Sequence, residues 1–305
     1  VVAGATRGAG RGVARMLGEA GATVYCTGRG SRGRPSSEGA FAGRPETVEE
    51  TAEMVDAAGG RGIPVRVDHR EEGEVAALFA RVGREAGRVD VLVNAFWGGP
   101  GVAWGGAFAD YPLETGRAML DAVWPHVLTC RHAVPLLRRG GLIVQLTEHD
   151  TLGFRGNVFY DLGRIAEARL AHALAEELAP KGITALALTP GFIRTEAVLD
   201  TFGATEADWR EVAERDAKAR SFGLAGSETP CFVGRAVAAL AADPEAARWS
   251  GGLLSSWALS DAYGFADVDG ARPHWGRYFA ENFPAFANAS PKAAFRWEVA
   301  PAKKS

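Results

Sequence analysis

The chain has 305 residues, of which 47% are hydrophobic and 23% are charged, and its formal net charge is −3. This composition is typical of a globular protein with enough apolar material for a core. The small negative charge excludes a general attraction to nucleic acid or to an anionic membrane, so neither is expected as a partner.

Three cysteines, Cys26, Cys130 and Cys231, are far apart in the sequence and lack metal-ligand spacing. Their small, odd number indicates buried thiols in a reducing compartment, so we expect a cytoplasmic protein without a metal site. No apolar run reaches transmembrane length and no signal peptide is visible. Because the first residues already resemble a strand that runs into a loop, preceding residues and N-terminal targeting stay open.

The first element is a strand that leads into "AGATRGAGRG", residues 3–12, before a helical pattern. Gly4, Gly8 and Gly10 allow a tight turn and let a pyrophosphate approach the backbone, while the following helix offers free N–H groups to the phosphates. A glycine-rich turn occurs in any α/β protein, but this one follows the first strand and precedes a helix. The position favours dinucleotide binding.

The second strand, residues 22–28, ends in "YCTGRG" and continues into a Gly-, Ser-, Arg- and Pro-rich loop over residues 28–45. NAD-binding folds usually carry a carboxylate here for the adenosine ribose, whereas this stretch offers Arg29. Arg7 lies in the glycine loop. Two guanidinium groups would suit a 2′-phosphate, so NADP(H) is favoured over NAD(H). The alternative is two solvated arginines in an arginine-rich chain.

Further apolar runs follow, with amphipathic helical patterns between them. Their nearly continuous apolar character predicts strands buried on both faces of a parallel sheet. The fold class is therefore α/β, a Rossmann-like doubly wound parallel sheet flanked by helices. We expect one domain over residues 1–256 and an aromatic C-terminal extension, residues 257–305, that packs on it. The remaining predicted strands are residues 62–68, 89–95, 141–147 and 183–189, and helical patterns cover residues 48–55, 75–82, 162–174 and 205–218, with another from Pro230.

Together these features resemble the short-chain dehydrogenase/reductase family over nearly the whole chain. The tail "LLSSWALSDAYGFADVDGARP", residues 253–273, is similar to the member-one type within it, whose members are NADPH-dependent carbonyl reductases. The resemblance implies a cofactor site formed by the glycine motif, the acidic residue after the third strand, the asparagine after the fourth, the P-G-x-x-x-T motif and their neighbours. These residues are Gly4, Thr6, Arg7, Gly8, Gly10, Arg29, Asp68, His69, Asn94, Pro190, Gly191, Ile193 and Thr195.

In the family, a tyrosine protonates the carbonyl oxygen while hydride arrives from the nicotinamide. Tyr160 matches that tyrosine, but the lysine expected four residues later is Arg164. Arginine keeps the positive charge that lowers a phenol pKa and can bond the ribose, but it cannot relay protons. We therefore expect Tyr160 as the acid/base and Arg164 as the residue that orients the cofactor and tunes Tyr160.

Two further family roles are altered. The serine that bonds the oxyanion corresponds to Thr147, thirteen residues before Tyr160, or with a one-residue gap to Glu148. An ionised Glu148 could not donate to an oxyanion, although a protonated one could. The family's asparagine falls near Ala122, and the nearby His126 is a possible substitute, although a structural histidine is the simpler interpretation.

Trp97 and Phe192 are expected to form walls of the substrate pocket, together with His126 and Glu148, although either aromatic side chain could be core. His149 and Asp150 extend the polar cluster at the end of the fifth strand, where substrate loops leave a parallel sheet. The structural alternatives are that Tyr160 and Thr147 only pack, and that Arg164 pairs with Glu167 or Asp161 on the helix surface.

Three functional hypotheses follow. The first is an NADP-dependent oxidoreductase of a ketone, aldehyde or alcohol, with Tyr160, Arg164 and Thr147 as the catalytic set. The second keeps the fold but performs dehydration, isomerisation or cyclisation, because the lysine, serine and asparagine equivalents are all replaced. The third is a protein that senses a cofactor without catalysis. The resemblance also implies a homodimer or homotetramer that pairs through the tyrosine helix and the helix before it.

Overall fold

A seven-stranded parallel sheet forms the centre of the computed structural model, which describes residues 1–284 apart from 36–40, 98–100, 103–106, 149–153 and 155. Its strand order is β3-β2-β1-β4-β5-β6-β7, so the order reverses beside β1. Ligands of such sheets bind at this switch point, outside the carboxyl ends of the strands. The strands are β1 (Val2–Ala3), β2 (Thr23–Gly28), β3 (Arg61–Arg66), β4 (Val89–Asn94), β5 (Leu137–Leu146), β6 (Thr184–Thr189) and β7 (Leu253–Ser255).

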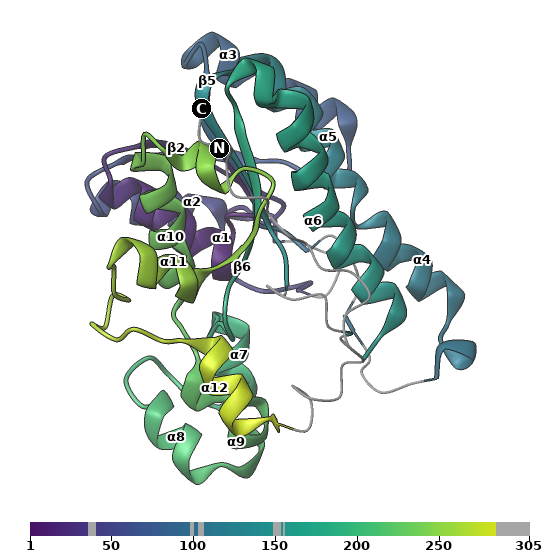
Figure 1. Cartoon of the computed structure of the whole chain (residues 1–305), viewed down its shortest axis with the longest axis vertical. Coiled ribbons are helices and arrows are strands. Elements are labelled where there is room, and N and C mark those ends of the chain that lie inside the picture. Colours follow the sequence, from purple (N-terminus) through teal and green to yellow (C-terminus); the bar gives the residue numbers. More distant parts are fainter. Residues whose placement is uncertain (36–40, 98–100, 103–106, 149–153, 155, 285–305) are drawn as a thin grey trace.

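Helices cover both faces of the sheet. Helices α7, α8 and α9 gather with α12 beyond the end of β6 from which the chain continues into α7 (Figure 1). Helices α1, α2, α10 and α11 cover one face, and α3 to α6 cover the other (Figure 1). Among the described residues, no helix combines the length and apolar character needed to span a membrane. The helices are α1 (Gly8–Glu19), α2 (Val48–Ala57), α3 (Glu72–Glu85), α4 (Leu113–Asp121), α5 (Trp124–Ala133), α6 (Val158–Leu178), α7 (Glu196–Phe202), α8 (Trp209–Arg215), α9 (Ala217–Phe222), α10 (Pro230–Ala242), α11 (Ser256–Tyr263) and α12 (Trp275–Asn282).

The strands supply both halves of the core because successive side chains point to opposite faces. Leu142 and Val144 of β5 pack with the α1 and α10 side, whereas Ile143 packs with the α3 and α6 side. In β2, Val24 packs with the α1 and α10 side and Tyr25 with the α3 and α6 side. This two-sided burial explains why the strands are apolar without alternation, and it confirms the predicted doubly wound class.

Local sequence signals set the helix starts near the expected site. The Thr47 hydroxyl accepts a hydrogen bond from the Glu50 N–H, and the Glu50 carboxylate accepts one from the Thr47 N–H, which is a capping box at α2. Asn157 caps α6 by accepting from the Tyr160 N–H. Thr229 caps α10, whose first residue is Pro230 as predicted.

The structure differs from the sequence prediction in three places. The predicted helix over residues 205–218 is two helices, because Asp216 adopts an extended backbone and caps α9 through the Ala219 N–H. The stretch after residue 252 contains the unpredicted strand β7 and helices α11 and α12. Strand β5 begins four residues before the predicted start, at Leu137.

The described part of the C-terminal extension packs on the same domain. Trp257 of α11 is buried, and the ring of Phe265 lies 5.2 Å from that of Phe232 in α10. Residues 285–305 of the predicted extension lie outside the described residues.

Candidate active site

A cleft of about 320 Å³ runs along the carboxyl ends of the central strands. It begins at the glycine loop and ends at Thr147, Glu148 and Arg164. Residues that are far apart in the sequence thus meet in one groove. Of the predicted site residues, the cleft is lined by Gly4, Thr6, Arg7, Gly8, Arg29, Asp68, His69, Trp97, Thr147, Glu148, Arg164, Pro190, Ile193 and Thr195.

The glycine loop is shaped by close backbone packing. Gly4 has a φ of +86°, which favours glycine, and a Cβ on Gly10 would lie 2.2 Å from the Gly4 carbonyl oxygen. Gly10 therefore supports the loop from behind, outside the cleft. The turn places the amino end of α1 at the groove, since Gly8 and Ala9 belong to its lining, as a pyrophosphate site requires.

The first N–H of α1 already has an anionic partner. The Gly8 N–H donates to Glu196 Oε2 at 2.9 Å, and Arg11 Nη1 lies 3.7 Å from the other oxygen of that carboxylate. Glu196 follows Thr195, whose side chain caps α7. A carboxylate from α7 thus stands where the family's phosphates are expected, a feature that the sequence analysis missed.

Among the described residues, one guanidinium nitrogen of Arg7 has a hydrogen-bond partner and another has none. Its Nε donates to Glu46 Oε2 at 3.1 Å, whereas its buried Nη2 has no hydrogen-bond partner among the described residues. Burial opposes ionisation of Glu46, but Arg44 and Arg7 lower its pKa to about 2. Glu46 therefore offsets part of the positive charge that the sequence assigned to the 2′-phosphate.

Asp68 and His69 lie at the adenosine end of the cleft in different environments. Burial opposes ionisation of Asp68, but hydrogen bonds from Arg70 hold its pKa below the usual range. Burial lowers the pKa of His69 to about 3, and its ring lies between the hydroxyl groups of Thr27 and Thr129. His69 is thus a neutral wall of the groove, and Asp68 is an anionic one.

Tyr160 lies in the first turn of α6 and is only 3% exposed. Its ring packs edge-on against Trp97 at 5.2 Å between centroids, and its hydroxyl hydrogen-bonds with Glu148 and Arg164. Burial is the largest cause that raises the pKa of Tyr160; Glu148 adds to the rise and Arg164 opposes it. The phenol is therefore held protonated beside a cation.

Arg164 lines the end of the cleft beside Tyr160, and its side chain is only 12% exposed, so it does not lie on the helix surface. Its Nη1 donates to both oxygens of Glu167, at 3.0 and 3.2 Å, and its guanidinium stacks 4.3 Å from the Trp97 ring centre. Burial works against its charge, but Glu167 first, then Tyr160 and Glu148, raise its pKa. The buried Nε has no hydrogen-bond partner among the residues described, so it remains available to a ligand in the cleft.

Thr147 stands at the end of β5 as predicted, but its hydroxyl is engaged. Thr147 Oγ1 donates to the Arg164 carbonyl oxygen at 2.8 Å. A hydroxyl has one proton to donate, so in this conformation it fastens β5 to α6 and offers a cleft ligand only acceptor capacity. The neighbouring Glu148 faces Tyr160, while His149 and Asp150 lie outside the described residues.

Besides Gly10, five predicted site residues lie behind the cleft or beside it rather than in its lining: Tyr160, described above, and Asn94, His126, Gly191 and Phe192. Asn94 and His126 are fully buried under the cleft floor and meet at Gln145, at 3.1 and 2.8 Å from its Oε1. Phe192 packs against Trp275 of α12, at 5.8 Å between centroids. Gly191 lies beneath the same indole. For His126 and Phe192 this differs from the predicted pocket position; Gln145 was not predicted at all.

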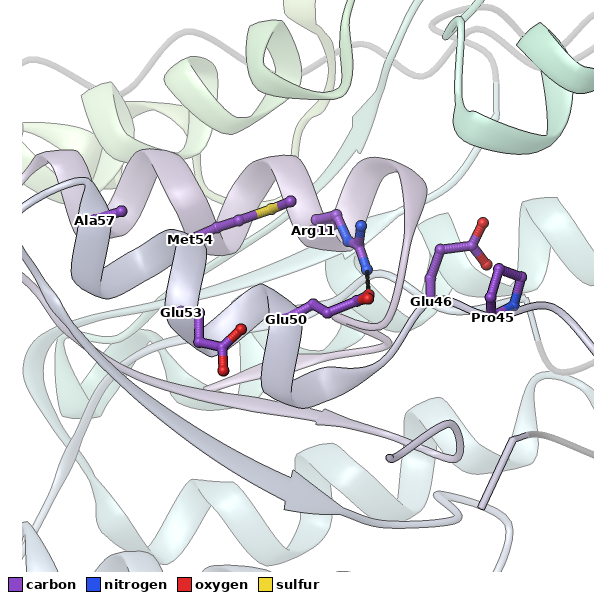
Figure 2. A pocket seen from close by; sticks show the side chains of 7 residues that line it. All are labelled: Arg11, Pro45, Glu46, Glu50, Glu53, Met54 and Ala57. Carbon is purple, nitrogen blue, oxygen red and sulfur yellow. Dashed lines mark hydrogen bonds and ion pairs between the residues drawn. The ribbon is translucent and has the colours of Figure 1, made fainter. Parts of the chain in front are cut away.

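A second, more open hollow of about 460 Å³ lies on the outer side of α1 and α2 (Figure 2). Its lining includes three carboxylates, but Glu50 is paired with Arg11 at 2.9 Å and Glu53 with Arg32 at 2.6 Å. Glu46 is paired as described above. Since these charges are already compensated within the protein, the hollow has no features of a ligand site. Nor do the described residues include a His, Cys, Asp or Glu cluster that could hold a metal.

Comparisons with known proteins agree with this geometry. Residues 4–251 match the family model described as Enoyl-(Acyl carrier protein) reductase. The chain is 34% identical to Dehydrogenase/reductase SDR family member 1 from Homo sapiens over 286 residues, which cover 88% of this chain and 83% of that protein. It is 28% identical to the 3-oxoacyl-[acyl-carrier-protein] reductase FabG of Staphylococcus aureus, covering 66% and 77%.

Solved structures share the fold. A short-chain dehydrogenase from Mycobacterium thermoresistibile superposes with a TM-score of 0.70 at 22% identity, covering 90% of each chain. A short-chain dehydrogenase from Burkholderia cenocepacia, solved in complex with NADP, gives a TM-score of 0.62 at 23% identity and covers 83% of this chain and 94% of that one.

Proposed function

Because the chain belongs to the short-chain dehydrogenase/reductase family of NAD(P)-dependent enzymes, we propose that it is an NADP-dependent reductase of ketones or aldehydes. One observation carries the proposal. Tyr160, a buried phenol held in its protonated form, hydrogen-bonds with Arg164, which lines the end of a groove that starts at a dinucleotide-type glycine loop. A small carbonyl compound or the corresponding alcohol is the expected partner.

The residues fit a bound dinucleotide. The buried Nη2 of Arg7 and Nε of Arg164 have no partner among the described residues and lie in side chains that line the groove at opposite ends. The first would donate to the adenosine end and the second to the nicotinamide ribose. Bound nicotinamide would supply the hydride. The preference for NADP is supported by Arg7 and Arg29, and by the NADP in the related Burkholderia cenocepacia structure.

Tyr160 is the proposed proton donor to the carbonyl oxygen. A phenol that stays protonated across neutral pH can give its proton as the oxygen gains negative charge. Arg164 holds the tyrosine hydroxyl and the ribose. The proposed polarising role of Thr147 requires its hydroxyl to leave the Arg164 carbonyl, or requires Glu148 to donate in its protonated form.

A second candidate function is proton-transfer chemistry without net redox change. The observation that favours it is the contact between Glu148 and Tyr160, which forms an acid/base pair at the cleft end. With Thr147 engaged by the backbone, this pair would handle protons without an oxyanion donor.

Two measurements test the first function. Fluorescence titration with NADPH and NADH tests cofactor binding, and NADPH oxidation against a panel of ketones, aldehydes and quinones tests turnover. Tyr160→Phe should bind NADPH like the wild type but lose at least about a hundredfold in kcat. Tight NADPH binding without turnover, together with a product of unchanged oxidation level, would transfer the assignment to the second function.

The cofactor preference has its own test. Arg29→Ala should weaken NADPH binding about tenfold while leaving NADH binding unchanged, because only NADPH carries the 2′-phosphate. Arg32→Ala is the matched control: it lies in the same loop but is exposed and paired with Glu53. Equal losses for both cofactors would contradict the proposed preference.

We further propose a cytoplasmic location and a homodimer or homotetramer. The location is supported by three free thiols, Cys26, Cys130 and Cys231, all buried. Burial raises the pKa of Cys26 and of Cys130 to about 12, which keeps both thiols unreactive.

A further inference from the structure

A chain of polar side chains leads from Arg164, beside Tyr160, into the interior of the protein. Arg164 binds Glu167 at 3.0 Å, and Glu167 Oε1 lies 3.4 Å from His126 Nε2. The other ring nitrogen of His126 lies 2.8 Å from Gln145 Oε1 in β5. The chain thus connects the tyrosine helix α6, through α5, to the central sheet.

Among these linked polar side chains, Glu167 is the one whose burial costs the most free energy. Its side chain is 0% exposed, and a carboxylate without water is stable only with close, well-oriented partners. Arg164 supplies two hydrogen bonds to Glu167. His126 supplies a third polar contact, and this contact comes from α5 rather than from α6. Because burying this carboxylate costs free energy, packing alone does not account for Glu167.

The role follows from the position of Arg164 between two sets of groups. The same guanidinium hydrogen-bonds with Glu167 and interacts with Tyr160 and Glu148. An unopposed cation beside a phenol would favour the phenolate. Here the cation is held toward Glu167, and its charge is offset by that carboxylate.

We propose that Glu167 is a positioning residue that holds the Arg164 guanidinium in place and offsets its charge, so that Tyr160 remains a proton donor. The inference rests on the proposed function for the role of Tyr160. The charged or titratable groups that face this unit are Glu148 from the loop after β5, Arg164 and Glu167 from α6, and His126 from α5.

The direct test needs neither cofactor nor substrate. Tyrosine labelled with 13C at Cζ reports phenol ionisation by NMR, and the chain has only five tyrosines. Loss of one signal in Tyr160→Phe assigns Tyr160. Removal of the charge in Glu167→Gln should lower the ionisation midpoint of Tyr160 by about one pH unit or more. Glu177→Gln, an exposed position on the same helix, should leave the midpoint unchanged.

Activity provides a second measurement. Alcohol oxidation begins from the phenolate, so a midpoint one unit lower should raise the oxidation kcat at pH 8 by up to about tenfold. If Glu167→Gln does not fold, as judged by circular dichroism, Glu167→Met removes the same charge without burying a new polar group.

The outcomes separate this inference from the proposed function. A lowered Tyr160 midpoint in a folded variant supports the role of Glu167 even if no carbonyl compound is reduced. A wild-type midpoint in a folded Glu167→Gln or Glu167→Met protein overturns it, even if the wild type proves to be an active reductase.

Discussion

Arg164 differs from a lysine in how many partners it can hold at once. Its Nη1 donates to both oxygens of Glu167, its guanidinium plane stacks on Trp97, and it hydrogen-bonds with Tyr160. A lysine ammonium is a compact point charge without a planar face that could stack in this way. The substitution of arginine for the family's lysine is therefore coupled to the presence of a buried acid one turn further along α6.

This coupling predicts a non-additive double-mutant cycle. In Arg164→Lys, Glu167 loses its guanidinium partner in a buried site, which should lower the free energy of unfolding by about 1–3 kcal/mol. The double variant Arg164→Lys/Glu167→Gln removes the unpaired charge and should recover at least half of that loss. Urea denaturation of the wild type, both single variants and the double variant measures the cycle. Additive losses would mean that the pair is not coupled.

The sequence predicted the reactive pair better than its surroundings. Tyr160 and Arg164 stand four residues apart, so helical spacing alone puts them on one face. The pairing of Arg164 with Glu167 was also foreseen as an alternative, but on the surface. Burial of Glu167 depends on how α5 docks against α6, which brings His126 within 3.4 Å, and such tertiary contacts leave no periodic signal in one sequence.

The amino end of α1 carries a prediction at the scale of helices. Glu196 accepts from the Gly8 N–H, so a negative side chain from α7 stands where cofactor phosphates are expected. Glu196→Gln should tighten NADPH binding several-fold at low salt, because a neutral amide repels phosphate less than a carboxylate does. Fluorescence titration at two salt concentrations measures this, with Glu211→Gln, exposed on α8, as the control. Weaker binding would instead make Glu196 part of the cofactor site.

Glu228 joins three elements around the P-G-x-x-x-T loop. Glu228 lies directly before the cap of α10. Its Oε2 accepts hydrogen bonds from the Gly191 N–H at 2.9 Å and from the hydroxyl of Ser256 in α11 at 2.8 Å. Its buried Oε1 has no partner within the described part of the chain. Burial raises its pKa from 4.5 to about 8. The protonated acid is therefore the form that fits the folded protein.

The sign of the pH effect follows from this shift. Between about pH 4.5 and 8 the folded protein binds a proton that the unfolded chain has released, so stability should fall as the pH rises through this window. Glu228→Gln presents an oxygen and an NH2 group where the acid presents its two oxygens. The variant should match the wild type near pH 5 and exceed it near pH 9, by an amount on the order of a few kcal/mol. Thermal unfolding across this range measures the difference, and parallel curves would contradict the assignment.

At the scale of the whole molecule, the sheet was predictable and the region beyond it was not. Continuous apolar runs identify strands buried on both faces, so five predicted strands match β2 to β6 to within a few residues at most ends. Strand β7 has three residues, too few for a pattern. Helices α8 and α9 are separated by Asp216, whose capping role depends on an extended backbone that a continuous helical pattern conceals.

The outer surface of the tyrosine side of the sheet supports self-association. Leu113 of α4 is 77% exposed, Trp124 of α5 59% and Leu162 of α6 47%, on helices that lie together along one side of the molecule (Figure 1). Several large apolar side chains exposed on neighbouring helices are typical of an interface. A two-fold axis would bury the same patch on both copies at once. This surface includes Leu162 of α6, the helix that carries Tyr160, so pairing would also hold this helix in place.

We therefore expect the wild type to be at least a dimer in size-exclusion chromatography with light scattering. Leu113→Glu/Leu162→Glu should shift it to monomer, because charges opposite each other across a two-fold interface repel and desolvate. Met54→Glu, a half-exposed apolar position on α2 at the other side of the sheet, should leave the assembly intact. If the wild type is monomeric, or if the double variant remains assembled while folded, pairing does not use this surface. In that case the exposed side chains on α4 and α6 would have to be covered by a different partner.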